Sequence, residues 1–107
     1  MKNTGKIVVF VTTSSYEEAE KIARLLLEKR KAACINIIPK VSSAYWWQGN
    51  IEKSEESLLI IKTREGLLPD LLSLVKQAHS YTVPEIIALP VTDGNPDYLS
   101  WVDAETS

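Results

Sequence analysis

Apolar and polar positions along this chain of 107 residues predict strands and helices in turn. Ile7–Val11 is an unbroken β-branched and aromatic run, which is typical of a central strand covered on both faces. Ser14 and Ser15 each precede a glutamate by three residues, the signature of a helix N-terminus. The helix that follows carries an apolar stripe at helical spacing, formed by Ala19, Ile22, Ala23, Leu26 and Leu27.

A long hairpin is predicted after this helix. Residues 33–38 form a second strand, and Pro39 removes a ladder hydrogen bond and bends the chain before Val41–Trp47 continue it. A turn is expected at Gly49-Asn50, and residues 51–61 return as a third strand that ends apolar on both faces.

A second helix, a fourth strand and a last helix complete the pattern. The second helix covers the apolar stripe from Leu67 to Ala78, and Pro69 leaves its first residue open because proline is tolerated only in the first turn. Residues 85–91 form the fourth strand. Asn95-Pro96 then caps and opens the terminal helix, which bears Trp101.

This order of elements predicts an α+β fold, a ferredoxin-like βαββαβ sandwich with a long central hairpin and an extra C-terminal helix. We expect residues 1–107 to form a single domain. A sandwich of this kind leaves one sheet face open, yet Val8 and Phe10 make the first strand apolar on that side too. The open face must be covered, most simply by copies of the same chain.

Aromatic side chains gather at the tip of the hairpin. Successive strand residues point to opposite faces, so Tyr45 and Trp47 share one side and Trp46 takes the other. Burying a tryptophan is worth about 4 to 6 kcal/mol before the entropy cost is subtracted. We therefore predict that the hairpin is an oligomer arm and that these three residues, with Trp101, lie in an interface between copies.

Composition and charge exclude several classes of function. The formal charge of −2 offers no basic field for nucleic acid or an anionic membrane, and no apolar run is long enough for a membrane span. The single cysteine, Cys34, fits a reducing compartment. No nucleophile and base are paired by a motif and no glycine loop is spaced to hold phosphate. We expect a cytoplasmic protein that is not an enzyme and has no organic cofactor.

Four stretches occur in order along the chain: AACINIIP, SAYWWQGNIEKSEESLLIIKT, HSYTVPEIIALPV and GNPDYLSW. Together with the first strand and helix they resemble the CutA divalent-cation-tolerance family over nearly the whole chain. The resemblance implies a tight homotrimer, in which hairpin strands pair across neighbours, and a role in divalent-cation binding or tolerance, copper especially. In one departure, Ser80 follows His79 where the family often has proline.

Metal chemistry singles out Cys34 and His79. Soft and borderline ions prefer thiolate and imidazole ligands, and one of each per chain is too few for a closed tetrahedral site. The ordinary alternatives are a small buried cysteine and a histidine favoured by a helix C-terminus. The topology places the two residues far apart, so a shared site needs different chains, or carboxylates such as Glu52 or Glu85.

A ligand cleft is expected at one end of the sheet. Residues 12–15, the hairpin base near Tyr45 and the loop 79–85 converge there, and polar groups beside aromatic rings are usual in small-molecule sites. Tyr81 and Glu85 are the candidate ligand-binding residues in this chain.

Lys62 is the third candidate, reaching into the cleft from a neighbour's third strand. The alternatives are that the aromatic residues only pack the interface and that Lys62 only pairs with a carboxylate. Two functions remain: a trimeric cation-binding protein of the tolerance type, or a signalling or scaffold trimer that binds a small molecule in its intersubunit clefts.

Overall fold

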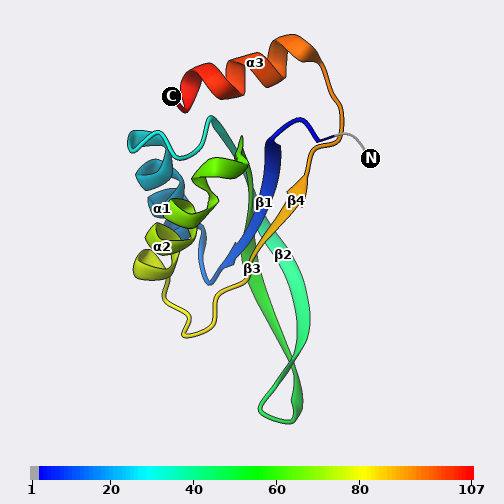
Figure 1. Cartoon of the computed structure of the whole chain (residues 1–107). Coiled ribbons are helices and arrows are strands. Elements are labelled where there is room, and N and C mark those ends of the chain that lie inside the picture. Colours follow the sequence, from blue (N-terminus) through cyan, green and yellow to red (C-terminus); the bar gives the residue numbers. More distant parts are fainter. Residues whose placement is uncertain (1–2) are drawn as a thin grey trace.

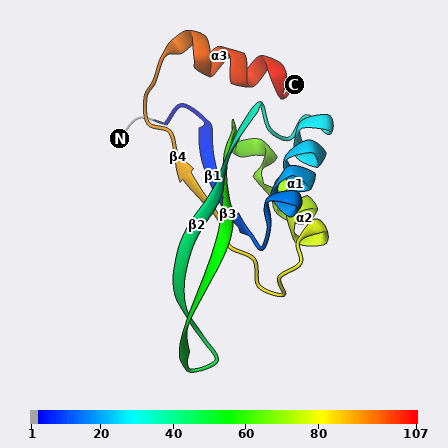
Figure 2. The same ribbon diagram turned by 180° about the vertical axis from the view of Figure 1, so that it is seen from behind.

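A computed structural model describes residues 3–107 and confirms the predicted α+β order of elements (Figure 1). The elements are β1 (Lys6–Thr13), α1 (Tyr16–Glu28), β2 (Cys34–Trp47), β3 (Asn50–Arg64), the short 3₁₀ helix η1 (Glu65–Leu67), α2 (Leu68–Ala78), β4 (Ile86–Pro90) and α3 (Pro96–Glu105). The antiparallel sheet has the strand order β2-β3-β1-β4, the ferredoxin-like arrangement. Helices α1 and α2 lie on the same side of the sheet in both views (Figures 1 and 2).

Side chains of β1 alternate between the core and the open face of the sheet. Ile7, Val9 and Val11 are buried, whereas Val8 and Phe10 are only half-buried. The buried partners of β1 in the core come from α1, α2 and β3, and the largest are Ile22, Leu26, Leu59, Ile61, Leu71 and Val75. Within one chain the sheet is therefore covered on one face only.

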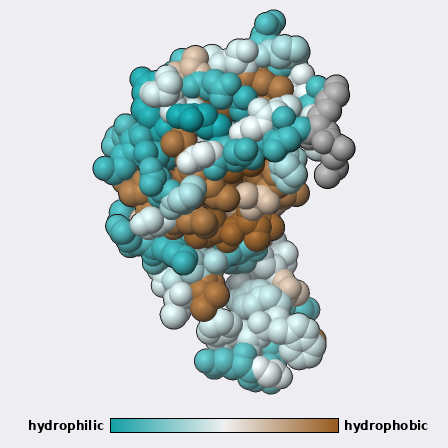
Figure 3. Space-filling model, viewed as in Figure 1, coloured by the Kyte–Doolittle hydropathy of each residue, from teal (hydrophilic) through white to brown (hydrophobic). Residues whose placement is uncertain are grey.

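The open face is continuous with other exposed apolar residues. On β4, Ile87 and Leu89 are 52% and 43% exposed. Figure 3 shows hydrophobic side chains gathered across the middle of the molecule, between α3 and the hairpin. A patch of this kind on a small domain marks an interaction surface.

The hairpin of β2 and β3 extends well beyond the body of the protein (Figures 1 and 2). Gln48 and Gly49 form its two-residue turn with φ angles of +50° and +82°, and Trp47 pairs with Asn50, so the turn lies one residue earlier than predicted. Both turn residues take the left-handed conformation because this turn matches the strand twist. The pairing of β2 with β3 shifts register between Ile38 and Val41, around the proline at which a bend is predicted.

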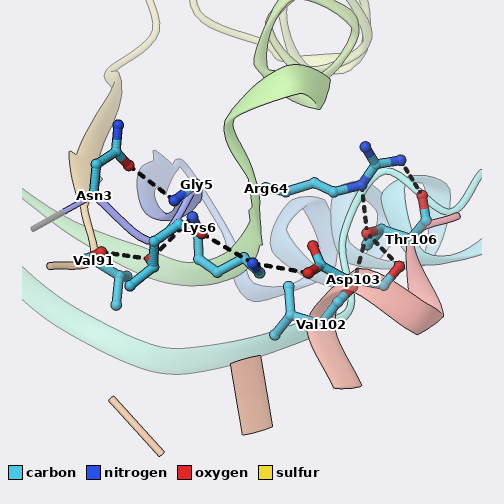
Figure 4. Close-up of polar contacts among 9 residues, drawn as sticks. Asn3, Gly5, Lys6, Arg64, Val91, Val102, Asp103 and Thr106 are labelled. Carbon is cyan, nitrogen blue, oxygen red and sulfur yellow. Dashed lines mark hydrogen bonds and ion pairs between the residues drawn. The ribbon is translucent and has the colours of Figure 1, made fainter. Parts of the chain in front are cut away.

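Helix α3 lies across the end of the sheet and is held there by polar contacts (Figure 4). Asn95 caps its N-terminus, as predicted, by accepting a hydrogen bond from the Asp97 amide at 3.1 Å. At the other end, Arg64 donates to the hydroxyl and the carbonyl oxygen of Thr106, at 3.0 and 2.8 Å. Lys6 pairs with Asp103 at 2.9 Å.

None of the helices within residues 3–107 combines the length and apolar character needed to cross a membrane.

Candidate functional site

The two predicted metal ligands lie at opposite ends of the sheet. Cys34 begins β2 opposite Lys62, which in turn pairs with Val8 of β1. His79 follows α2, and its Nε2 lies 2.6 Å from the carbonyl oxygen of Thr12, at the far end of β1. Val8 and Thr12 are four positions apart on β1, about 13 Å along a strand. One chain therefore cannot bring this thiol and this imidazole to the same ion.

Both nitrogens of His79 already have partners. Nε2 donates to the Thr12 carbonyl oxygen, and Nδ1 accepts a hydrogen bond from the Tyr81 amide at 3.0 Å. The imidazole ring also packs against the Tyr81 ring at a centroid distance of 4.8 Å. These contacts orient the imidazole ring and the loop after α2. A metal ion would have to displace one of the two hydrogen bonds.

Cys34 is half-buried on the open face beside Lys62 and Tyr98. The Lys62 amino group lies 4.0 Å from the Cys34 sulfur and donates a hydrogen bond to the side-chain oxygen of Asn36. Burial and the neighbouring thiol raise the pKa of Tyr98. Across residues 3–107, no three side chains among Cys, His, Asp and Glu gather closely enough to hold a metal ion. The donors of a single chain thus do not fit a copper site.

A cleft of about 790 Å³ lies between residues 42–47 of the hairpin and the loop after α2. Tyr81 and Glu85 line it, as does Tyr45. Lys62 of the same chain does not. The remaining lining residues are mostly aromatic or hydroxyl-bearing: Thr12, Ser42, Ser43, Ala44, Trp46, Trp47, Glu56, Ser80, Thr82 and Val83. The volume and the mixture of rings and polar groups suit a small ligand.

Glu56 is the cleft residue that sequence reasoning missed. Its side chain is nearly buried, with the residue 8% exposed, and it accepts a hydrogen bond from the Tyr81 hydroxyl at 2.8 Å. Burial and this hydrogen bond raise the pKa of Tyr81 above its ordinary value of 10.0, so the phenol remains a donor. A signal was present in the sequence, because Glu56 shares the strand face of Leu58 and Ile60 on the way to the apolar end of β3.

The cleft carries two carboxylates, Glu56 and Glu85, and no Lys, Arg or His among its lining residues. Neither forms an ion pair within the described part of the chain. Lys62 lies on the same face of β3 as Glu56, but six residues away, about 20 Å along a strand. The cleft of one chain is therefore acidic and has no cation of its own.

Glu18 links the start of α1 to the loop that lines the cleft. Ser15 caps α1 by accepting a hydrogen bond from the Glu18 amide at 3.1 Å. The Glu18 carboxylate accepts hydrogen bonds from the amides of Ser14 at 3.0 Å and Ser80 at 2.8 Å. Burial alone would raise the pKa of Glu18, but hydrogen bonds from Ser80 and Ser14 outweigh it and lower the pKa. Proline at position 80 would lack the donor N–H.

Comparison with known proteins identifies relatives of this chain. The family model described as CutA1 divalent ion tolerance protein matches residues 7–105. The divalent-cation tolerance protein CutA of Thermus thermophilus is 48% identical over 99 residues, which cover 92% of this chain and 96% of that protein. Rice chloroplastic CutA 1 is 47% identical over 94% of this chain, which spans only 56% of the length of that protein. Mouse CutA is 50% identical over 91% of this chain, which spans only 55% of its length.

Solved structures agree closely with the fold. A rice CutA1 structure has a TM-score of 0.94 at 45% identity and covers 98% of this chain and 96% of its own. A structure of the periplasmic divalent cation tolerance protein CutA from Archaeoglobus fulgidus has a TM-score of 0.93 at 41% identity, covering 95% of this chain and 99% of its own.

We predict that Glu18→Gln destabilises the protein near neutral pH, by of order 1 kcal/mol or less after solvent screening. The folded pKa of Glu18 lies below its ordinary value of 4.5, so the carboxylate stabilises the fold above that pH. This contribution is lost as the pH falls through the folded pKa. Thermal unfolding from about pH 7 to about pH 3 should therefore show wild type approaching the variant in acid.

The exposed neighbour Glu17 gives the matched control for this experiment. Glu17→Gln should leave the pH dependence of unfolding close to that of wild type. A constant difference between wild type and Glu18→Gln at every pH would contradict the assigned role of the Glu18 charge.

Proposed function

Because the chain belongs to the CutA1 divalent ion tolerance family, we propose that it acts in tolerance to divalent cations, copper in particular, as a cytoplasmic homotrimer. One observation carries the proposal: the family model described as CutA1 divalent ion tolerance protein matches residues 7–105. Within residues 3–107, Cys34 and His79 lie at opposite ends of the sheet and no three ligating side chains gather. A copper site therefore needs ligands from more than one chain. The proposed role is binding rather than catalysis.

Exposed apolar residues support assembly with other copies. Trp46, Trp47 and Tyr45 at the hairpin tip are 73%, 47% and 42% exposed, and Trp101 of α3 is 42% exposed. Strands β2 and β4 are the two edges of the sheet, and their outer backbone groups are available for pairing with another chain. Neighbouring hairpins that pair along these edges would bury both the aromatic tip and the open face.

Copper would bind through the Cys34 thiolate, because a soft or borderline ion prefers sulfur. The further ligands would come from a neighbouring chain: His79, after it exchanges one of its present hydrogen bonds, or a carboxylate such as Glu52 or Glu85. The single cysteine also supports the cytoplasm as the location, because a reduced thiol persists there. The relative from Archaeoglobus fulgidus is named periplasmic.

A second candidate function is a signalling or scaffold trimer that binds a small molecule in its intersubunit clefts. The cleft beside Tyr81 and Glu85 favours it, because its volume falls in the range of small-ligand sites and rings and polar groups converge there. Within one chain Lys62 lies away from this cleft, so it would enter from a neighbour.

We predict that wild type sediments at micromolar concentration as a trimer of about three times the 12.0 kDa chain. The double variant Trp46→Ala/Trp47→Ala should dissociate or aggregate, because truncating a buried tryptophan costs about 3 to 5 kcal/mol. Tyr16→Ala is the control, since Tyr16 is also an exposed aromatic residue but lies on α1, away from the hairpin. A stable wild-type monomer would contradict the proposed assembly.

Copper binding should depend on Cys34, the single thiol of the chain. We expect Cys34→Ser to weaken copper affinity by at least about tenfold, because the hydroxyl is a poor ligand for a soft ion. The trimer should remain assembled in sedimentation. Ala33→Ser, which alters the neighbouring residue and keeps the thiol, should bind copper like wild type. Equal affinity in wild type and Cys34→Ser would remove Cys34 from the site.

Small-molecule binding should depend on the Tyr81–Glu56 pair. In a screen of nucleotides and metal ions against the trimer, a cleft ligand should change the fluorescence of the tryptophans that line the cleft. Tyr81→Phe should weaken that ligand by about tenfold, because Glu56 loses its donor. Tyr16→Phe, which alters an exposed ring on α1, should not. Binding that is unchanged in Tyr81→Phe would place the ligand outside this cleft.

A further inference from the structure

We infer that Lys62 of one chain enters the acidic cleft of the next chain and pairs there with Glu56 and Glu85. The inference rests on the proposed homotrimer and deepens it, because each cleft then contains residues of two chains. Three observations carry it: an uncompensated acidic cleft, an uncompensated lysine, and an apolar strip that joins them on one face of the sheet.

The cleft needs a positive charge that its own chain does not supply. Glu56 is 8% exposed, and its hydrogen-bond donor, the Tyr81 hydroxyl, is neutral. A nearly buried carboxylate without a cation is strongly unfavourable, and a cation within contact distance offsets its desolvation. Glu85 adds a second negative charge to the same cleft. The strongest complement to this site is an amino or guanidinium group.

Lys62 is the half-buried lysine that lacks a carboxylate within residues 3–107. Its amino group contacts the side-chain oxygen of Asn36 and the sulfur of Cys34, neither of which is a carboxylate. The two other half-buried lysines of the described chain have carboxylate partners: Lys6 pairs with Asp103, and Lys31 with Asp70. A charge that is partly withdrawn from water and faces the open side of the sheet is placed for a partner outside its own chain.

Lys62 and Glu56 lie on the same face of β3, at opposite ends of an apolar strip. Leu58 and Ile60 stand between them on that strand, and the half-buried Phe10 extends the strip onto β1. The six-residue separation prevents Lys62 from reaching Glu56 of its own chain. A second chain that covers the strip brings its own lysine and its own carboxylate to this face.

The occupant of the strip must be apolar along most of its length and carry an amino group at one end. The open face of a second copy has this pattern, whereas a small free cation would leave the apolar strip exposed. Contact between two unlike ends of a surface is heterologous, and repeated contacts of this kind form a ring when the rotation between neighbours closes. A homotrimer closed in this way holds one Lys62 in each of its clefts.

A zero-length carbodiimide tests the pairing, because it joins an amine to a carboxylate only when the two groups are in contact. Equal amounts of ¹⁵N-labelled and unlabelled chain are mixed, assembled and treated, and the digest is analysed by mass spectrometry. We expect a peptide pair in which Lys62 is joined to Glu56 or Glu85, with one partner labelled and the other unlabelled. Covalent dimers and trimers should appear on a denaturing gel.

Three variants accompany the cross-linking. Lys62→Gln should abolish the joined peptide and raise the trimer dissociation constant by at least about tenfold, because it leaves Glu56 without a cation. Lys62→Arg, which keeps the charge, should restore assembly. Lys53→Gln removes an exposed lysine from the same strand and should behave like wild type.

Other outcomes separate this inference from the proposed homotrimer. A trimer that yields no Lys62 cross-link to either cleft carboxylate, or only links within one chain, overturns the inference and leaves the homotrimer standing. Tetramethylammonium that binds wild type and is lost in Glu56→Gln also overturns it, because the cleft charge would then be open to a free cation. A wild-type monomer at every concentration overturns both.

Discussion

The uncovered face of the four-stranded sheet is the constraint on which the rest of the structure depends. Helices α1 and α2 cover one face, and the other keeps Val8, Phe10, Ile87 and Leu89 wholly or partly in contact with water. Burying such a face outweighs the loss of freedom on association only if the cover is apolar and well fitted. A second copy that covers this face would account for the aromatic hairpin, the open strand edges and the half-buried lysine.

Strands and helices could be predicted from the sequence because each is specified by neighbouring residues. The unbroken run at Ile7–Val11, the serine cap of α1 and the Asn95-Pro96 start of α3 all depend on contacts a few residues apart. The turn residues are Gln48 and Gly49, one position before the predicted Gly49-Asn50, because glycine and asparagine are both common turn residues and only the strand register decides which pair forms the turn.

The chemistry of the cleft was less predictable, because it joins residues that are remote in the sequence. Tyr81 reaches Glu56 across 25 positions, and Ser80 reaches Glu18 across 62. His79 shows the same difficulty. Its type and position predict a metal ligand, and only the fold shows that both ring nitrogens have hydrogen-bond partners, Thr12 and Tyr81, in the same chain. Residue type predicts what a side chain can do, whereas its partners decide what it does.

The strand order also dictates when the sheet can close during synthesis of the chain. Strand β4 pairs with β1, so residues 86–90 lie beside a strand that is synthesised well before them. The hairpin leaves the ribosome well before residues 86–90, and its tryptophans meet solvent while the edge beside β1 is still vacant. Because chains grow by only about 5 to 20 residues per second, this interval lasts seconds. Nascent chains translated close together on one message are the nearest source of copies to cover the exposed hairpin.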